Sequence, residues 1–165
     1  MKRIFAPLAL LTLLLLAAGC APKITSLQRK EAASLVSEAQ FASTLREWRR
    51  AEELTAKAAA LCPDNGEYWL NLGSFRRRLD NLSGARAAYT SAAKAYGAAY
   101  QADPKDPQPL MQQVYVYSLL GKPKDALKAL KRAQADHGGN PGVKNFTEQA
   151  LERLCEDPEF KALAV

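Results

Sequence analysis

The chain has 165 residues, and its 23 basic and 17 acidic residues give a formal net charge of +6 at pH 7. This length corresponds to one domain with a sizeable core. The excess charge is modest and is spread along the chain, so it does not indicate a nucleic-acid-binding surface. A weak preference for anionic lipids or acidic partners is the most that it supports.

The chain begins with the features of a secretory signal peptide. Two basic residues, Lys2 and Arg3, precede an apolar run over residues 4–18. As a helix this run would be about 22 Å long, which is short of the ~30 Å hydrocarbon core of a bilayer. A positive start, a short apolar stretch and a small-residue exit are typical of a secretory signal.

The apolar run ends in the sequence LAAGC at residues 16–20, which resembles the lipobox of bacterial lipoproteins. In that family the cysteine thiol receives a diacylglyceryl group, and the chain is cut just before it. The leucine that the family usually has three residues before the cysteine is Ala17 here, with a leucine one step earlier. The resemblance implies a lipoprotein signal peptide over residues 1–19, a covalent lipid on Cys20 and a lipid-anchored linker over residues 20–26. A plain signal peptide with an incidental cysteine is the alternative.

A lipid on Cys20 would hold the mature chain at a membrane. One acyl chain anchors only marginally, but the cysteine of the family carries two or three. Residue 21 is alanine rather than the aspartate that often marks retention at the inner membrane of enterobacteria. The resemblance therefore implies an outer-membrane location facing the periplasm, in a host that has such a membrane. Residues 21–24 span at most ~14 Å, so we expect the domain to lie close to the bilayer.

A repeat runs through the region that follows. Three copies share two alanines seven residues apart: Ala51 and Ala58, Ala85 and Ala92, Ala126 and Ala133. The second copy follows the first by 34 residues, and the third follows the second by 41, which is 34 plus 7. Seven residues make two helical turns, so they can lengthen a helix without rotating its buried face. We place this lengthened helix at residues 82–102.

The repeated residues resemble the tetratricopeptide repeat (TPR), a 34-residue helix–turn–helix unit. Arg76 stands where the family usually has an aromatic residue. The resemblance implies an all-α fold, an α-solenoid of about three TPR-like helix–turn–helix pairs over residues 27–140; an ordinary bundle with accidental alanine spacing is the alternative. The second copy carries the best match, in Trp69, Leu72, Gly73, Ala85, Tyr89 and Ala92.

Capping residues mark the start and the end of this array. Thr25 and Gln28 fit a capping box before the first helix. Residues 143–155 have an apolar side and a charged side, so we expect one helix there with the polar outer face of a terminal cap. Asp157 followed by proline predicts a last short helix. Residues 141–165 are thus assigned to C-terminal capping helices.

Little in the sequence suggests catalysis. His137 stands beside two glycines at a predicted helix end, where capping or contact with solvent explains it better than chemistry does. There is no CxxC motif, HExxH motif or glycine-rich phosphate loop, so we expect no enzyme, no metal, no cofactor beyond the lipid and no small-molecule substrate. The charged runs at residues 52–53 and 76–78 are expected on solvated faces. Cys62 and Cys155 can form a disulfide in an oxidising periplasm, although their spacing does not establish one.

In TPR arrays the first helix of each pair lines a concave groove, and the resemblance places partner binding there. Side-chain amides can pair with a peptide backbone, and arginine can hold a carboxylate; a merely wetted surface is the alternative. Chaperone-binding members clamp a terminal carboxylate at set positions, of which only Asn71 matches, so this clamp is not expected. The positions that the resemblance assigns to the groove include Gln40, Asn71, Ser74, Arg77, Arg78, Gln112 and Tyr115.

These features predict a lipid-anchored adaptor that binds protein or peptide partners in the bacterial cell envelope. Similar lipoproteins help to assemble pili, secretion channels or outer-membrane complexes, and no residue chooses among these. The alternative is a self-assembling structural subunit of an envelope complex, which would dock through a ridge of Tyr89, Tyr96 and Tyr100 on the long helix.

Overall fold

The structure is a computed structural model that describes residues 23–165. The expected signal peptide and Cys20 lie outside the described residues. Within the described part, nine helices are present and no strand is found. None of these helices has the length and apolar character needed to cross a membrane.

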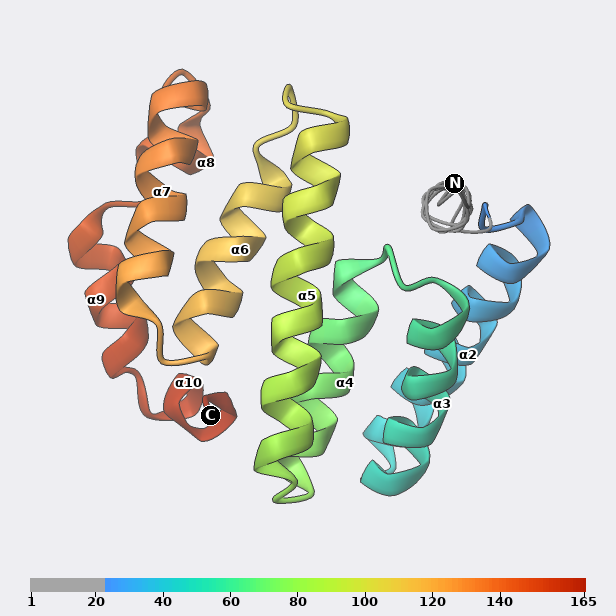
Figure 1. The fold of residues 1–165 in the computed structure, drawn as a ribbon. Helices are drawn as coiled ribbons and strands as arrows, with labels where there is room; N and C mark the ends of the chain where they lie inside the picture. Colours follow the sequence, from blue (N-terminus) through green and yellow to red (C-terminus); the bar gives the residue numbers. More distant parts are fainter. Residues whose placement is uncertain (1–22) are drawn as a thin grey trace, which may run out of the picture.

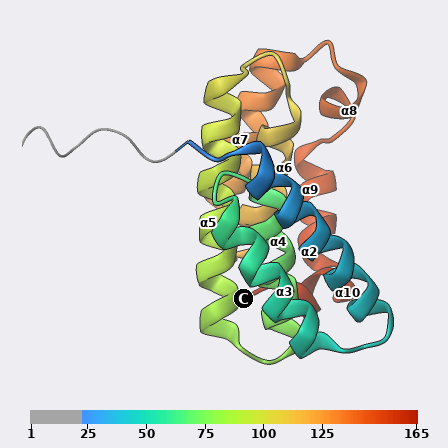
Figure 2. The same ribbon diagram turned by 90° about the vertical axis from the view of Figure 1, so that its right-hand side faces the viewer.

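Six helices form three antiparallel pairs that stack side by side (Figure 1). Each helix packs against its neighbours in chain order, and Figure 2 shows that α9 and α10 lie on the opposite side of the stack from α5. The expected all-α solenoid of three TPR-like pairs is therefore confirmed. The pairs are α2 (Ser26–Thr44) with α3 (Trp48–Leu61), α4 (Gly66–Arg78) with α5 (Leu82–Ala102), and α6 (Gln108–Leu119) with α7 (Pro123–His137).

The turn within each pair has the same geometry. Its central residue has a positive φ, at Arg46 (61°), Asp80 (57°) and Gly121 (64°), and these positions are again 34 and 41 residues apart. The next residue closes each turn with a backbone hydrogen bond to a carbonyl five residues earlier, as in a Schellman motif. These bonds join Glu47 to Ala42, Asn81 to Arg76 and Lys122 to Tyr117.

The small residues of the repeat lie where helices approach one another. All six repeated alanines are fully buried. A Cβ added at Gly73 would come within 2.3 Å of the Tyr89 ring, which has no exposed surface. The bounds of α5 coincide with the expected 82–102, so the seven extra residues extend one helix.

The proposed tyrosine ridge is wrong. Tyr89 and Tyr100 are buried, and Tyr96 is half-buried with its ring against Gly66. These tyrosines point into the stack because α5 is flanked by α4 and α6. They therefore belong to the core rather than to a docking surface.

The single capping helix expected over residues 143–155 is also wrong, because the segment is broken in two. A short α8 (Pro141–Lys144) is followed by α9 (Glu148–Glu156). Between them, the Thr147 hydroxyl accepts a hydrogen bond from the Ala150 N–H at 3.2 Å and starts a new helix. The apolar residues of both pieces still face the array, so the capping role is kept.

The last helix, α10 (Pro158–Leu163), begins as predicted at Asp157, whose carboxylate accepts a hydrogen bond from the Phe160 N–H at 2.9 Å. The capping box at the other end is likewise confirmed, with Thr25 and Gln28 exchanging hydrogen bonds. Both termini of the helical array are thus defined by local side-chain caps.

One expectation about polar residues needs correction, and the open question of a disulfide is answered for the described residues. Arg76 and Glu52 are not solvated: their side chains are 25% and 20% exposed and form an ion pair of 2.8 Å between α4 and α3. The guanidinium takes the place of the aromatic side chain typical of the repeat and ties two pairs together. Cys62 and Cys155 are both free thiols and pack in separate apolar clusters, so they form no disulfide.

Candidate partner-binding surface

The face formed by α4 and α6 brings together two of the predicted groove residues. Asn71 on α4 and Gln112 on α6 line one polar hollow of about 430 Å³. Both amides can donate and accept hydrogen bonds, which suits an extended peptide backbone. The other residues around this hollow are Asn65, Glu67, Leu70, Tyr96 and Gln108.

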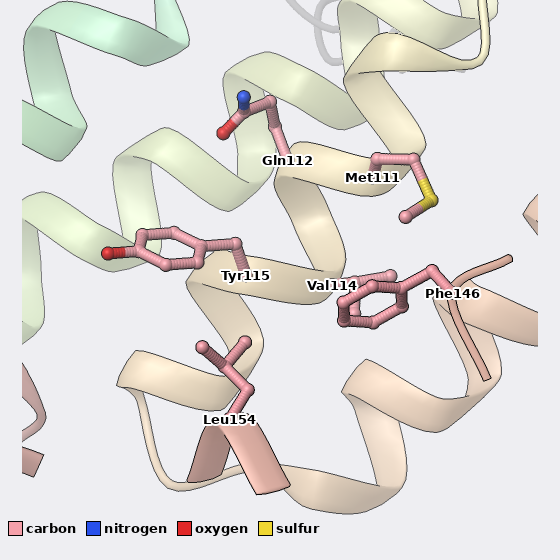
Figure 3. A pocket seen from close by; sticks show the side chains of 6 residues that line it. All are labelled: Met111, Gln112, Val114, Tyr115, Phe146 and Leu154. Atoms are coloured by element: carbon pink, nitrogen blue, oxygen red, sulfur yellow. The ribbon is translucent and has the colours of Figure 1, made fainter. Parts of the chain in front are cut away.

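A second hollow, of about 340 Å³, is mainly apolar and lies between α6 and the C-terminal cap. Figure 3 shows Phe146 and Leu154 of the cap facing Val114 and Tyr115 of α6, with Met111 at one end. Sequence reasoning missed the contribution of the cap, because Phe146 and Leu154 were assigned only to the buried side of a helix. The only sequence signal for this contribution is that both residues lie on the apolar side of the predicted helix.

Gln112 connects these two hollows. It lines the apolar hollow and the polar hollow, and also a third of about 310 Å³ that includes Arg29 and Asp64. Its amide therefore stands between an apolar subsite and a polar one. A chain crossing this face would meet the Gln112 amide in passing from one to the other.

The neighbouring part of the same face is occupied by the C-terminal segment of the chain itself. Arg77 Nε donates to the Ala164 carbonyl at 2.9 Å, and the Tyr89 hydroxyl donates to the Leu163 carbonyl at 3.0 Å. The Val165 N–H donates to the Leu119 carbonyl at 2.9 Å. Backbone groups of the tail are thus held by α4 and α6, and by a tyrosine of α5 that reaches between them.

An aromatic contact completes this attachment. Phe160 of α10 is 6% exposed and meets Tyr115 edge-on, with ring centroids 5.4 Å apart. Burial raises the pKa of the Tyr115 hydroxyl, in keeping with a ring that is covered on one side. Tyr115 was expected to anchor a partner; it holds α10 and also lines the apolar hollow.

The remaining predicted groove residues do not gather at the hollows. The Arg78 guanidinium lies 4.8 Å from the centre of the Trp48 ring on α3, and Ser74 donates to the Leu70 carbonyl of its own helix. Gln40 is exposed on α2 and does not line either hollow. With Arg77 bound to the tail, the expected pair of arginines for a partner carboxylate is not available in this arrangement.

The histidine lies in a polar cluster at the far end of α5. Tyr100 donates to the Asp136 carboxylate at 2.7 Å, and its hydroxyl is 3.2 Å from His137 Nε2. The hydrogen bond from Tyr100, with that from Arg132, holds the pKa of Asp136 below its usual value. His137 therefore packs against Tyr100 rather than standing in solvent, and the cluster joins α5 to α7. Among residues 23–165, no group of three or more His, Cys, Asp or Glu side chains could hold a metal ion.

Comparisons with known proteins give structural similarity only. No protein-family model matches the chain, and no curated protein matches it. Two similar solved structures are the Arabidopsis OM64 TPR domain (16% identity, TM-score 0.46, 78% of this chain and 97% of that one) and the first TPR of Spaghetti (RPAP3) bound to the HSP90 peptide SRMEEVD (15%, 0.48, 78% and 96%). A third is the CopN–Scc3 complex (19%, 0.48, 86% and 85%).

Proposed function

We propose that this protein is a lipid-anchored adaptor of the bacterial cell envelope that binds a segment of a protein partner on the face formed by α4 and α6. One observation carries the proposal: this face already holds a peptide segment, its own C-terminus. Hydrogen bonds with Arg77 of α4 and the Leu119 carbonyl of α6, a third from Tyr89 of α5, and one buried phenylalanine fix that segment. The face therefore has both the donors and the apolar surface that peptide recognition needs.

The part of the face left open by the tail suggests how a partner would bind. An apolar side chain would enter the hollow beside Tyr115, and the adjoining backbone would pair with the amides of Gln112 and Asn71. Glu67 lines the polar hollow, so an uncharged or basic segment suits this site better than an acidic one. This differs from the expectation that arginines of the groove, Arg77 and Arg78, would hold a carboxylate of the partner.

The membrane attachment of the adaptor would come from Cys20. A lipid there would leave only a short connection to α2, which begins at Ser26. The domain would then face the periplasm from the outer membrane and present its binding face to components of a pilus, a secretion channel or an outer-membrane complex. The lipobox resemblance supports this location.

A photo-crosslinking experiment tests the binding face. A photoreactive amino acid replaces Gln112 in the full chain, expressed in its own host, and the matched control carries it at Lys94, which is exposed on α5. We expect a discrete crosslinked product from position 112 and none from position 94. Equal products from both positions, or none from position 112, would contradict the proposal.

A separate experiment tests the anchor. Cys20→Ser should abolish incorporation of labelled palmitate and release the protein from the membrane fraction, because a hydroxyl cannot replace the thiol as acyl acceptor. Cys155→Ser is the matched control, since this thiol is only partly buried in the folded domain. Palmitate incorporation that is equal in the parent and Cys20→Ser would rule out the lipid anchor.

A further inference from the structure

The outer face of α2 exposes large apolar side chains. In the part of the chain that the structure describes, the most exposed large apolar residues are Leu27 (72%), Phe41 (64%) and Leu45 (54%). The first two lie on α2, and Leu45 is its C-cap residue. This helix is the first of the stack (Figure 1), and of the described helices only α3 packs extensively on it.

These side chains form a stripe that points away from the array. Leu27, Ser34 and Phe41 are spaced by seven residues, or two turns, and so share one face of the helix to within about 20° per step. Three buried residues of α2 lie on the opposite side, Ala32, Val36 and Ala39, and the fourth, Ala42, lies about a quarter turn from the stripe. The stripe is therefore an unpartnered face with an apolar side chain at each end and a small one at its middle.

The charges on the stripe identify what covers it. Lys30 and Glu38 are exposed and lie four residues before and four residues after Ser34. They are eight residues apart, too far to pair with each other, and neither takes part in an ion pair among the described residues. If a second α2 lies antiparallel with a twofold axis at Ser34, Lys30 faces the second copy's Glu38, and Leu27 faces its Phe41. Each contact occurs twice. A parallel pair would instead set like charges against each other.

We propose that α2 is a homodimer interface, in which two copies of this chain pair through antiparallel α2 helices around Ser34. Closed twofold pairing requires a self-complementary surface, and the positions of Leu27, Lys30, Glu38 and Phe41 satisfy this condition. Charged residues that flank an apolar seam set the orientation of paired helices. The surface is distinct from the α4–α6 face, so the proposal does not depend on peptide binding.

The first experiment locates the twofold axis. Ser34→Cys is introduced into the full chain in a Cys155→Ser background, and whole cells that express it are treated with a mild oxidant; the Cys155→Ser chain alone measures any dimer formed through Cys20. Only residues near the axis meet their own copies, so Ser34→Cys should give a disulfide-linked dimer. The matched control Ser37→Cys, three residues away on the same helix, should give at least tenfold less dimer. Equal crosslinking of the two variants, or no dimer with Ser34→Cys, would overturn the proposal.

The second experiment tests the charge pairing. In the Ser34→Cys chain, Lys30→Glu or Glu38→Lys alone should lower the crosslinked fraction about tenfold, since each replaces two attractions by two repulsions. The combined swap should restore the parent level. Thermal unfolding of the three variants verifies that the fold is unchanged. A double variant that crosslinks as poorly as the single ones would refute the antiparallel dimer. The same result is expected if another segment of the chain, rather than a second copy, covers α2.

Discussion

The two ends of the helix stack differ in how their last helix is covered. At the C-terminal end, α9 packs on α6 and α7 with Leu151 buried, and its outer side is charged. The chain then turns back and buries Phe160 between α4 and α6. At the N-terminal end, Phe41 and Leu27 of α2 remain exposed to solvent.

This difference shows that the array is capped within the described chain at one end only. A repeat cannot bury its apolar face alone, so arrays require terminal units with a polar outer surface. Apolar side chains that are buried by other parts of the same chain stabilise the fold. The exposed apolar side chains of α2 can stabilise only the association with another molecule. Equivalent substitutions should therefore destabilise the fold at the C-terminal end and change its stability much less at the N-terminal end.

The sharpest comparison uses one phenylalanine from each end. Phe160→Ala should lower the free energy of unfolding by about 3–5 kcal/mol, because it empties a buried site. Phe41→Ala should change it by no more than about 0.5 kcal/mol, as expected for an exposed side chain. Urea unfolding of both variants measures the difference. Equal losses would mean that the two ends are covered alike.

Overpacking gives a second comparison of covered and uncovered faces. Ala92 is fully buried in the middle of the array, so Ala92→Leu should destabilise the fold by about 1–3 kcal/mol. Ala85→Leu should behave in the same way. Ala33→Leu, on the exposed side of α2, is the matched control and should leave thermal stability unchanged. If the buried variants melt like the parent, the packing register of the repeats is wrong.

The features that the sequence predicted are those that depend on local patterns. The 34-residue period, the lengthened α5 and the caps at Thr25 and Asp157 all follow from small residues, prolines and short polar side chains. The interactions that cause these features act within one or two turns of a helix, or between neighbouring helices at the positions that recur in each repeat. Such causes can be read from residue types alone.

The features that the sequence did not predict depend on contacts between distant residues. Arg77 meets Ala164, 87 positions later, and no spacing rule connects an arginine on α4 with a carbonyl of the tail. The break between α8 and α9 was missed because Thr147 competes as an N-cap within a continuous amphipathic pattern. The cap supplies two of the six residues that line the apolar hollow, and the positions that the repeat assigns to the groove include none from the cap.

Single polar contacts should distinguish the two ends more weakly. Arg77→Ala removes the bond to the tail and should cost about 1 kcal/mol, a net value typical of one hydrogen bond. Arg29→Ala, at the N-terminal end, breaks an ion pair with Asp64 whose side chains are 52% and 49% exposed. It should cost less than Arg77→Ala, because solvent and salt screen an exposed ion pair. Thermal unfolding at moderate salt measures both, and a larger loss for Arg29→Ala would reverse the comparison.

The last expected effect appears at high pH and again separates a half-buried ring from an exposed one. Burial, with a smaller contribution from the Glu67 carboxylate, raises the pKa of Tyr96 to about 12, whereas an unfolded tyrosine titrates near pH 10. The unfolded state thus releases this proton first, so folding stability is full below about pH 10 and falls as the pH rises towards 12.

Tyr96→Phe should weaken this alkaline loss of stability, measured as the difference between urea midpoints at pH 8 and pH 11. Phe41→Tyr adds a hydroxyl on the exposed face of α2 and should leave the difference as in the parent. A parent-like loss in Tyr96→Phe would show that the Tyr96 hydroxyl does not set the alkaline limit of the fold.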